Sequence, residues 1–181
     1  MNDKLTATDR VEASTGYNTQ PNDSMDIAGH YSAICCGADG VVKWTEEFFN
    51  IVVTVGKNAT LDGILGNTAQ GAVYMGLKGT GTAVAADTMT SHASWSEITA
   101  ISVRGTPSFS AASAGSKATS SAVSFTMTGT ATVAGCFIVV GGTSAVSNTT
   151  GILFSAGDFS SPKSVVSGDT IAVSYTATLT G

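Results

Sequence analysis

The stretch SAVSFTMTGTATVAGCFIVV, residues 121–140, carries the two clearest strand patterns in the chain. In its first half Val123, Phe125 and Met127 alternate with serine and threonine, which is typical of a strand with one buried face. In its second half residues 133–140 form a continuous apolar run between glycine-containing segments, which predicts a strand buried on both faces. Together the two patterns predict a β-rich domain with a substantial core.

Strand patterns recur on both sides of this stretch. They cover residues 30–36, 41–45, 51–55, 72–77, 95–103, 151–154 and 169–179. Asp39-Gly40 should join the first two as a hairpin, because Asp-Gly supplies the positive φ angles of a tight turn. Residues 46–50 are ambiguous between strand and helix.

Helical spacing is found in one short segment. Leu61, Ile64 and Leu65 predict a helix over residues 58–65, with Gly66 ending it. A single helical turn capped by Asp87 is also expected over residues 87–93.

Eight or nine short strands separated by Gly, Ser and Asp turns favour an antiparallel sandwich or barrel over βαβ units. The predicted fold is therefore all-β: an antiparallel two-sheet sandwich, jelly-roll or immunoglobulin-like, with one short helix and an extended N-terminal arm. The alternation predicts a core made of Val73, Met75, Val123, Phe125, Val133, Ile138, Val140, Ile171, Val173 and Tyr175.

The first 28 residues differ in composition from the rest. They are polar, and their apolar side chains follow no period, so the segment should not order alone in water. We predict an extended arm at residues 1–28 and a β-sandwich domain at residues 29–181. The arm is expected to bind a partner chain through its isolated apolar residues, which are Leu5, Val11, Tyr17 and Ile27.

Composition and charge exclude several classes of partner. The chain has 181 residues, 8 basic and 13 acidic, and a net charge of −5. Nucleic acids and anionic membranes are unfavourable partners, because both attract basic surfaces. Charged residues make up only 12%, against about 25% in an average protein. Glycine, alanine, serine and threonine fill about half of the chain instead.

Targeting signals and cysteines suggest synthesis in a reducing cytoplasm. No apolar run reaches the roughly 20 residues of a membrane span, and the first residues do not form a signal peptide. The three cysteines, Cys35, Cys36 and Cys136, are an odd number without a disulfide framework. We therefore expect free thiols, with Cys136 buried.

Catalytic and metal-binding patterns are weak throughout. His30 and His92 have no second ligand at metal-binding spacing, and Glu46 and Glu47 should point apart. Asp158 and Asp169 are interpreted as turn residues. No catalytic, cofactor-binding or metal-binding residue is predicted, and the chain is not expected to be an enzyme. Trp44 and Trp95 could stack on sugars, although a core position is favoured for both.

Several segments resemble a family of small structural proteins encoded by tailed bacteriophages. The similar segments are residues 39–44, 51–58, 73–77, 86–89, 92–97, 154–159 and 167–170, and they keep their order and approximate spacing. The resemblance spans roughly residues 30–181. It implies membership of the virion and supplies no catalytic residues.

Three interpretations of function follow. The first is a capsid decoration or cement protein that binds the major capsid protein, with further copies of the chain as additional partners. The second is a tail or fibre component that contacts other tail proteins or the host surface. The third is a carbohydrate-binding module that uses Trp44 or Trp95. In the first two, the protein is made in the host cytoplasm and is found in the virion.

Overall fold

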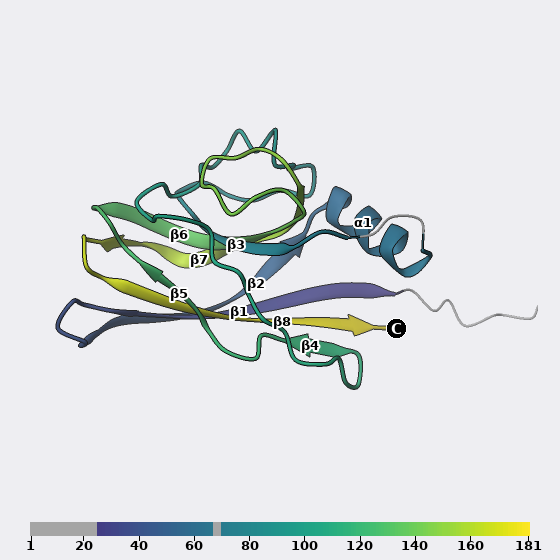
Figure 1. Cartoon of the computed structure of the whole chain (residues 1–181), viewed down its shortest axis with the longest axis horizontal. Coiled ribbons are helices and arrows are strands. Elements are labelled where there is room, and N and C mark those ends of the chain that lie inside the picture. Colours follow the sequence, from purple (N-terminus) through teal and green to yellow (C-terminus); the bar gives the residue numbers. More distant parts are fainter. Residues whose placement is uncertain (1–24, 67–69) are drawn as a thin grey trace, which may run out of the picture.

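The computed structural model describes residues 25–66 and 70–181. In this part of the chain the secondary structure comprises eight strands and one helix (Figure 1). Their bounds are β1 (Asp26–Cys36), β2 (Val42–Val52), α1 (Thr54–Ile64), β3 (Val73–Lys78), β4 (Ser116–Ala118), β5 (Val123–Thr126), β6 (Ala131–Val140), β7 (Ile152–Val165) and β8 (Thr170–Thr180).

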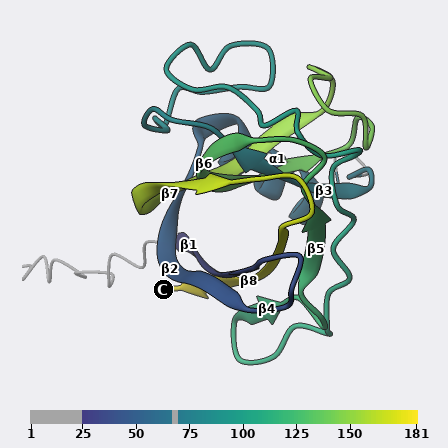
Figure 2. The same ribbon diagram turned by 90° about the vertical axis from the view of Figure 1, so that its left-hand side faces the viewer.

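All strand pairs are antiparallel, in the order β3-β6-β7-β2-β1-β8-β4, and β5 also pairs with β8. The sheet curls around a central space, as the end view shows (Figure 2). Strand β2 connects its two halves. Most of β2 pairs with β1, whereas residues 50–52 pair with β7.

An irregular segment, residues 97–109, helps to close the curled sheet. Gly105 pairs with Met75 of β3, and Phe109 pairs with Thr119, just after β4. A Cβ atom at position 105 would lie 2.1 Å from Val123 Cγ1. Glycine at this position therefore lets the segment pass close to β5, between the two edges of the sheet.

The main core fills the inside of the curl. Of the ten predicted core residues, eight are buried; Val73 is half-buried and packs against the cluster, and Val140 is half-buried at the end of β6. Tyr31 stacks on Phe48 with ring centroids 5.0 Å apart, and its centroid lies 4.6 Å from that of Tyr175. The strand patterns at residues 121–140 thus predicted correctly which of their side chains are buried in the core.

A second, smaller cluster lies on the outer face of β6 and β7. Phe137, Val139 and Leu153 pack there against Val53 and Trp95. Strand β6 is buried from Val133 to Val139 because it has the main core on one face and these loop residues on the other. The prediction of a doubly buried strand is confirmed.

The all-β, antiparallel prediction with one short helix is confirmed. The strands follow one hydrogen-bonded path in a curled sheet, which does not by itself establish two facing sheets. The helix begins at Thr54, earlier than predicted, so Thr54 and Val55 are helical rather than extended. Glycine at position 56 lets this first turn pack closely on β7, because a Cβ there would lie 2.2 Å from the Phe154 carbonyl oxygen.

Two predicted elements are wrong. Residues 95–103 form no strand beyond a single bridge at Glu97, and residues 87–93 form no helical turn. In the first segment Trp95, Ile98 and Ile101 are buried at three-residue spacing, which a loop can also produce. The Asp87 carboxylate accepts hydrogen bonds from the Val84 amide and the Trp95 indole instead of capping a helix.

The predicted arm overlaps the first strand. Strand β1 begins at Asp26, so residues 26–28 belong to the sheet, and Ile27 is half-buried opposite Leu179 of β8. The other predicted anchors, Leu5, Val11 and Tyr17, lie outside the described residues. Within the described ranges, no helix is both long and apolar enough to cross a membrane.

Phe125 gives a direct test of the core. It is 3% exposed, and Phe125→Ala should lower the free energy of unfolding by about 3–5 kcal/mol through lost burial and the cavity left behind. Phe49, which is 75% exposed, is the matched control, and Phe49→Ala should change stability by less than about 0.5 kcal/mol. Urea unfolding measures both; equal midpoints for the two variants would contradict the strand orientation.

Cys136 should be chemically inert in the native protein. Its side chain is fully buried, and burial raises the pKa of its thiol far above the usual range. Burial also raises the pKa of Cys35 to about 11, whereas Cys36 is half-buried. Timed iodoacetamide labelling at neutral pH with peptide mass spectrometry should modify Cys36 first and Cys136 only on unfolding. Rapid native labelling of Cys136 would be inconsistent with this structure.

Candidate functional site

Two long loops, residues 79–99 and 141–151, lie over the outer side of β6 and β7, at the top of Figure 1. Between them is an open cleft of about 550 Å³. It is lined by residues 89–93, 95–97, 99 and 147–149. The cleft is built by loops, so the groups that hold these loops decide its shape.

Lys78 at the end of β3 fixes the first loop. Its fully buried ammonium lies 2.6 Å from the Asp158 carboxylate and also donates to the carbonyls of Gly79 and Gly81. Lys78 and Asp158 both pair with Gly135 of β6, which has no side chain to separate them. An ion pair and two hydrogen bonds to carbonyl groups surround the ammonium, so we interpret Lys78 as a structural cation.

This arrangement corrects one prediction made from the sequence. Asp158 lies within β7 and holds a lysine, so its assignment as a turn residue is wrong. The segment Gly79-Thr80-Gly81-Thr82 is a loop, and the carbonyl groups of Gly79 and Gly81 accept hydrogen bonds from the buried ammonium.

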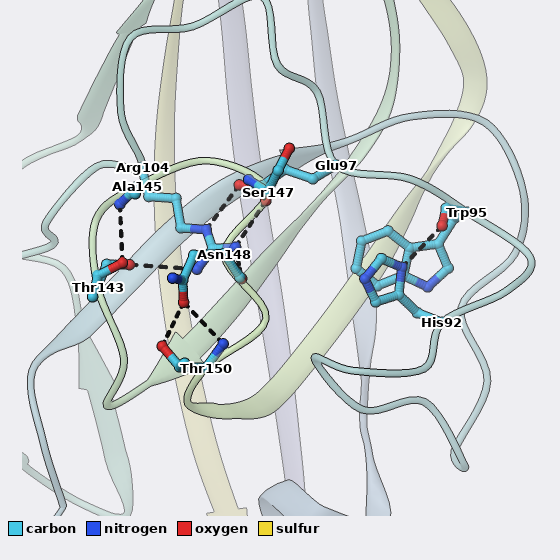
Figure 3. A network of polar contacts seen from close by, with 9 residues as sticks. All are labelled: His92, Trp95, Glu97, Arg104, Thr143, Ala145, Ser147, Asn148 and Thr150. Atoms are coloured by element: carbon cyan, nitrogen blue, oxygen red, sulfur yellow. Dashed lines mark hydrogen bonds and ion pairs between the residues drawn. The ribbon is translucent and has the colours of Figure 1, made fainter.

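Arg104 and Glu97 hold the second loop to the first segment (Figure 3). The guanidinium makes two hydrogen bonds of 2.8 Å to the Glu97 carboxylate. It also donates to the carbonyl oxygens of Thr143 and Asn148, while the Ser147 amide donates to Glu97. Both charged side chains are almost completely buried, so the pair positions the loop around residues 143–148.

A series of aromatic contacts leads from the sheet to the cleft. Phe137 of β6 lies 5.4 Å from Trp95, and Trp95 stacks on His92 with centroids 4.0 Å apart. Trp95 is 5% exposed, which confirms its prediction as a core residue. Trp44 is half-buried and packs against Phe159 at 5.5 Å.

The His92 tautomer follows from its hydrogen bond. Its Nδ1 lies 2.9 Å from the Trp95 carbonyl oxygen, which can only accept, so Nδ1 carries the proton (Figure 3). In the neutral ring Nε2 is then an acceptor. His30, on the far side of the chain, contacts Phe49 edge-on at 5.2 Å and lies 4.0 Å from Glu47.

The other acidic candidates are structural. Glu46 is buried and binds Ser160 and Lys163, whereas Glu47 is exposed, so the two diverge as expected. Burial opposes ionisation of Glu46, but hydrogen bonds from Lys163 and Ser160 outweigh it and lower the pKa.

Asp169 lies at the turn before β8, as predicted, and accepts a hydrogen bond from the Val166 amide. It also forms a 2.5 Å ion pair with Lys43, and this contact lowers the pKa of the Asp169 carboxyl. Across residues 25–66 and 70–181, no three His, Cys, Asp or Glu side chains gather closely enough to hold a metal ion.

A second surface of interest is the outward face of β1, β2 and β8. On β1 and β8 most outward residues are small or hydroxyl-bearing, such as Ala28 opposite Thr178 and Ser32 opposite Ser174, whereas β2 contributes Glu47 and Phe49. Phe49 projects from this face with 75% of its surface exposed. We call this surface the small-residue face.

The burial of Lys78 and Arg104 was not predicted from the sequence, although the sequence contains a signal for the pair of Arg104 and Glu97. Glu97 and Arg104 are the only charged residues between Asp87 and Lys117. Two opposite charges isolated in a long uncharged segment can be expected to pair. Lys78 had no such signal, because its partner lies 80 residues away in β7.

The chain matches no protein-family model, no curated protein and no solved structure.

The Arg104–Glu97 pair should dominate the stability of the loops. Arg104→Met would leave the Glu97 carboxylate buried without its partner, at a cost of about 3–5 kcal/mol of unfolding free energy. Adding Glu97→Leu should recover part of this loss, because both charges are then removed. Chemical denaturation of the two single variants and the double variant measures the coupling; additive losses would show that the pair is not coupled.

Proposed function

We propose that this chain is a structural protein of a tailed-bacteriophage virion, most simply a capsid decoration or cement protein that binds the outer shell. The major capsid protein is the proposed partner, together with further copies of the chain, and the virion is the proposed location. The finer classification of the curled sheet as a jelly-roll or immunoglobulin-like sandwich belongs to the same proposal. No enzymatic step is part of it.

The observation that carries the proposal is the small-residue face. Serine, threonine and alanine side chains lose little conformational entropy when a neighbour covers them. The small-residue face can therefore be buried at low entropic cost, and the exposed Phe49 offers an aromatic anchor of the kind enriched in interfaces. The sequence segments similar to phage structural proteins supply the choice of partner.

The N-terminal arm is the second proposed contact. Residues 1–24 precede β1, whose first residues pair with the end of β8. Leu5, Val11 and Tyr17 would enter apolar pockets of a capsid subunit. Ile27 is half-buried in the sheet, so it contributes less to binding a partner than the three residues that precede the sheet.

A tail or fibre component is the alternative, and it fits the same face and arm. The two locations differ in copy number, with hundreds of copies per particle for decoration and a few dozen at most for a tail protein. Quantitative gel densitometry of purified virions distinguishes them. Absence of the chain from purified virions would refute both.

Attachment can be tested by adding purified protein to particles that lack it. Phe49→Ser should weaken binding about tenfold or more if Phe49 is an anchor. Leu65→Ser is the matched control, because Leu65 at the end of α1 is also exposed, at 79%, but lies outside the small-residue face. Deletion of residues 1–24 should leave the fold intact and weaken attachment. If Phe49→Ser and the chain without residues 1–24 both bind particles as tightly as the unaltered protein, the proposed contacts are wrong.

A further inference from the structure

The cleft between the two loops has features of a ligand site that the proposed function does not use. His92 and Trp95, which line it, form a stacked pair, and Trp95 makes a tilted contact with Phe137. Phe137 and Trp95 are covered on both sides, whereas His92 is half-exposed and lines the cleft. Figure 3 shows His92 lying against Trp95, and the cleft reaches this half-exposed ring.

The cleft presents no uncompensated charge. Glu97 is the charged residue in its lining, and both of its carboxylate oxygens bind Arg104, with Ser147 donating to one of them. An anionic ligand would need a free cation here, and a cationic ligand a free carboxylate. The lining thus favours a neutral ligand.

The remaining polar groups are hydroxyls, an amide and an imidazole nitrogen. Thr90, Ser96, Thr99 and Ser147 bring hydroxyl groups to the cleft. The Asn148 Oδ1 atom accepts from the Thr150 amide, which leaves the Nδ2 donors at the other end of the side chain. With Nδ1 of His92 bound to the Trp95 carbonyl, Nε2 is an acceptor in the neutral ring.

The walls are held before any ligand arrives. Lys78 fixes the loop that carries His92, and Arg104 fixes the loop that carries Asn148. A prearranged site loses less conformational entropy on binding, so even a few polar contacts can give measurable affinity.

We propose that the cleft binds a neutral saccharide, with one pyranose ring lying on the half-exposed His92 ring and its hydroxyls bonded to His92 Nε2 and the surrounding serine and threonine hydroxyls. The C–H face of a sugar suits an aromatic ring, and its hydroxyls act as both donors and acceptors. The stacking ring is His92, not the buried Trp95. This inference is independent of virion location.

The test uses the full chain and saturation-transfer-difference NMR. The probes are glucose, galactose, mannose and N-acetylglucosamine, their short β-linked oligomers, and glucose 6-phosphate as a charged comparison. At least one neutral saccharide should give saturable binding, and the phosphate should not improve it. Failure of every neutral saccharide to bind would overturn the proposal.

Variants locate the binding. His92→Ala should weaken it about tenfold or more, and His30→Ala, which alters the other histidine outside the cleft, should leave it unchanged. Thr149→Trp adds bulk at an exposed position in the lining and should block the cleft without removing a stacked ring. If Thr149→Trp binds as well as the unaltered chain, the saccharide lies elsewhere and the assignment is wrong, whatever happens to His92→Ala.

Discussion

The buried contact between Arg104 and Glu97 is the constraint on which the irregular half of this molecule depends. Strands hold one another through their own hydrogen bonds, but the segments at residues 79–109 and 141–151 have few such bonds. Arg104 joins them by binding a carboxylate in one segment and two carbonyl groups in the other. The buried ion pair and its hydrogen bonds therefore hold these segments together where strand pairing does not.

The position of Arg104 gives this contact a wider effect. The next residue, Gly105, is the one that pairs with β3 and passes close to β5. The Arg104 guanidinium also lies over the Phe137 ring, with 5.4 Å to the centroid. The same residue therefore connects the closure of the sheet, the outer hydrophobic cluster and the second wall of the cleft.

Residues with regular periodicity could be placed from the sequence, and residues in loops could not. The alternation at Val123 and Phe125 and the continuous run before Val140 reflect burial in strands, and both gave correct core positions. The segment from Trp95 to Val103 has similar residue types, but it is a loop: Trp95 packs in the outer cluster on β6 and β7, whereas Ile98 and Ile101 pack in the main core. Such packing depends on distant partners and leaves no local period. The cleft was missed for the same reason, because Lys78 and Asp158, which fix one wall, are distant in sequence.

The pairing of β1 with β8 has a mechanical consequence. Asp26 pairs with Thr180, so the first and last strands meet at the same end of the sheet and run antiparallel from there. A force that pulls these two ends apart would break the hydrogen bonds between β1 and β8 one pair after another, so that each pair would bear the load alone. A force along β1 that is balanced by contacts on the sheet surface would act on all of its hydrogen bonds to the neighbouring strands at once. A protein attached through both its leading segment and its sheet face would thus resist tension far better than one held by its two ends.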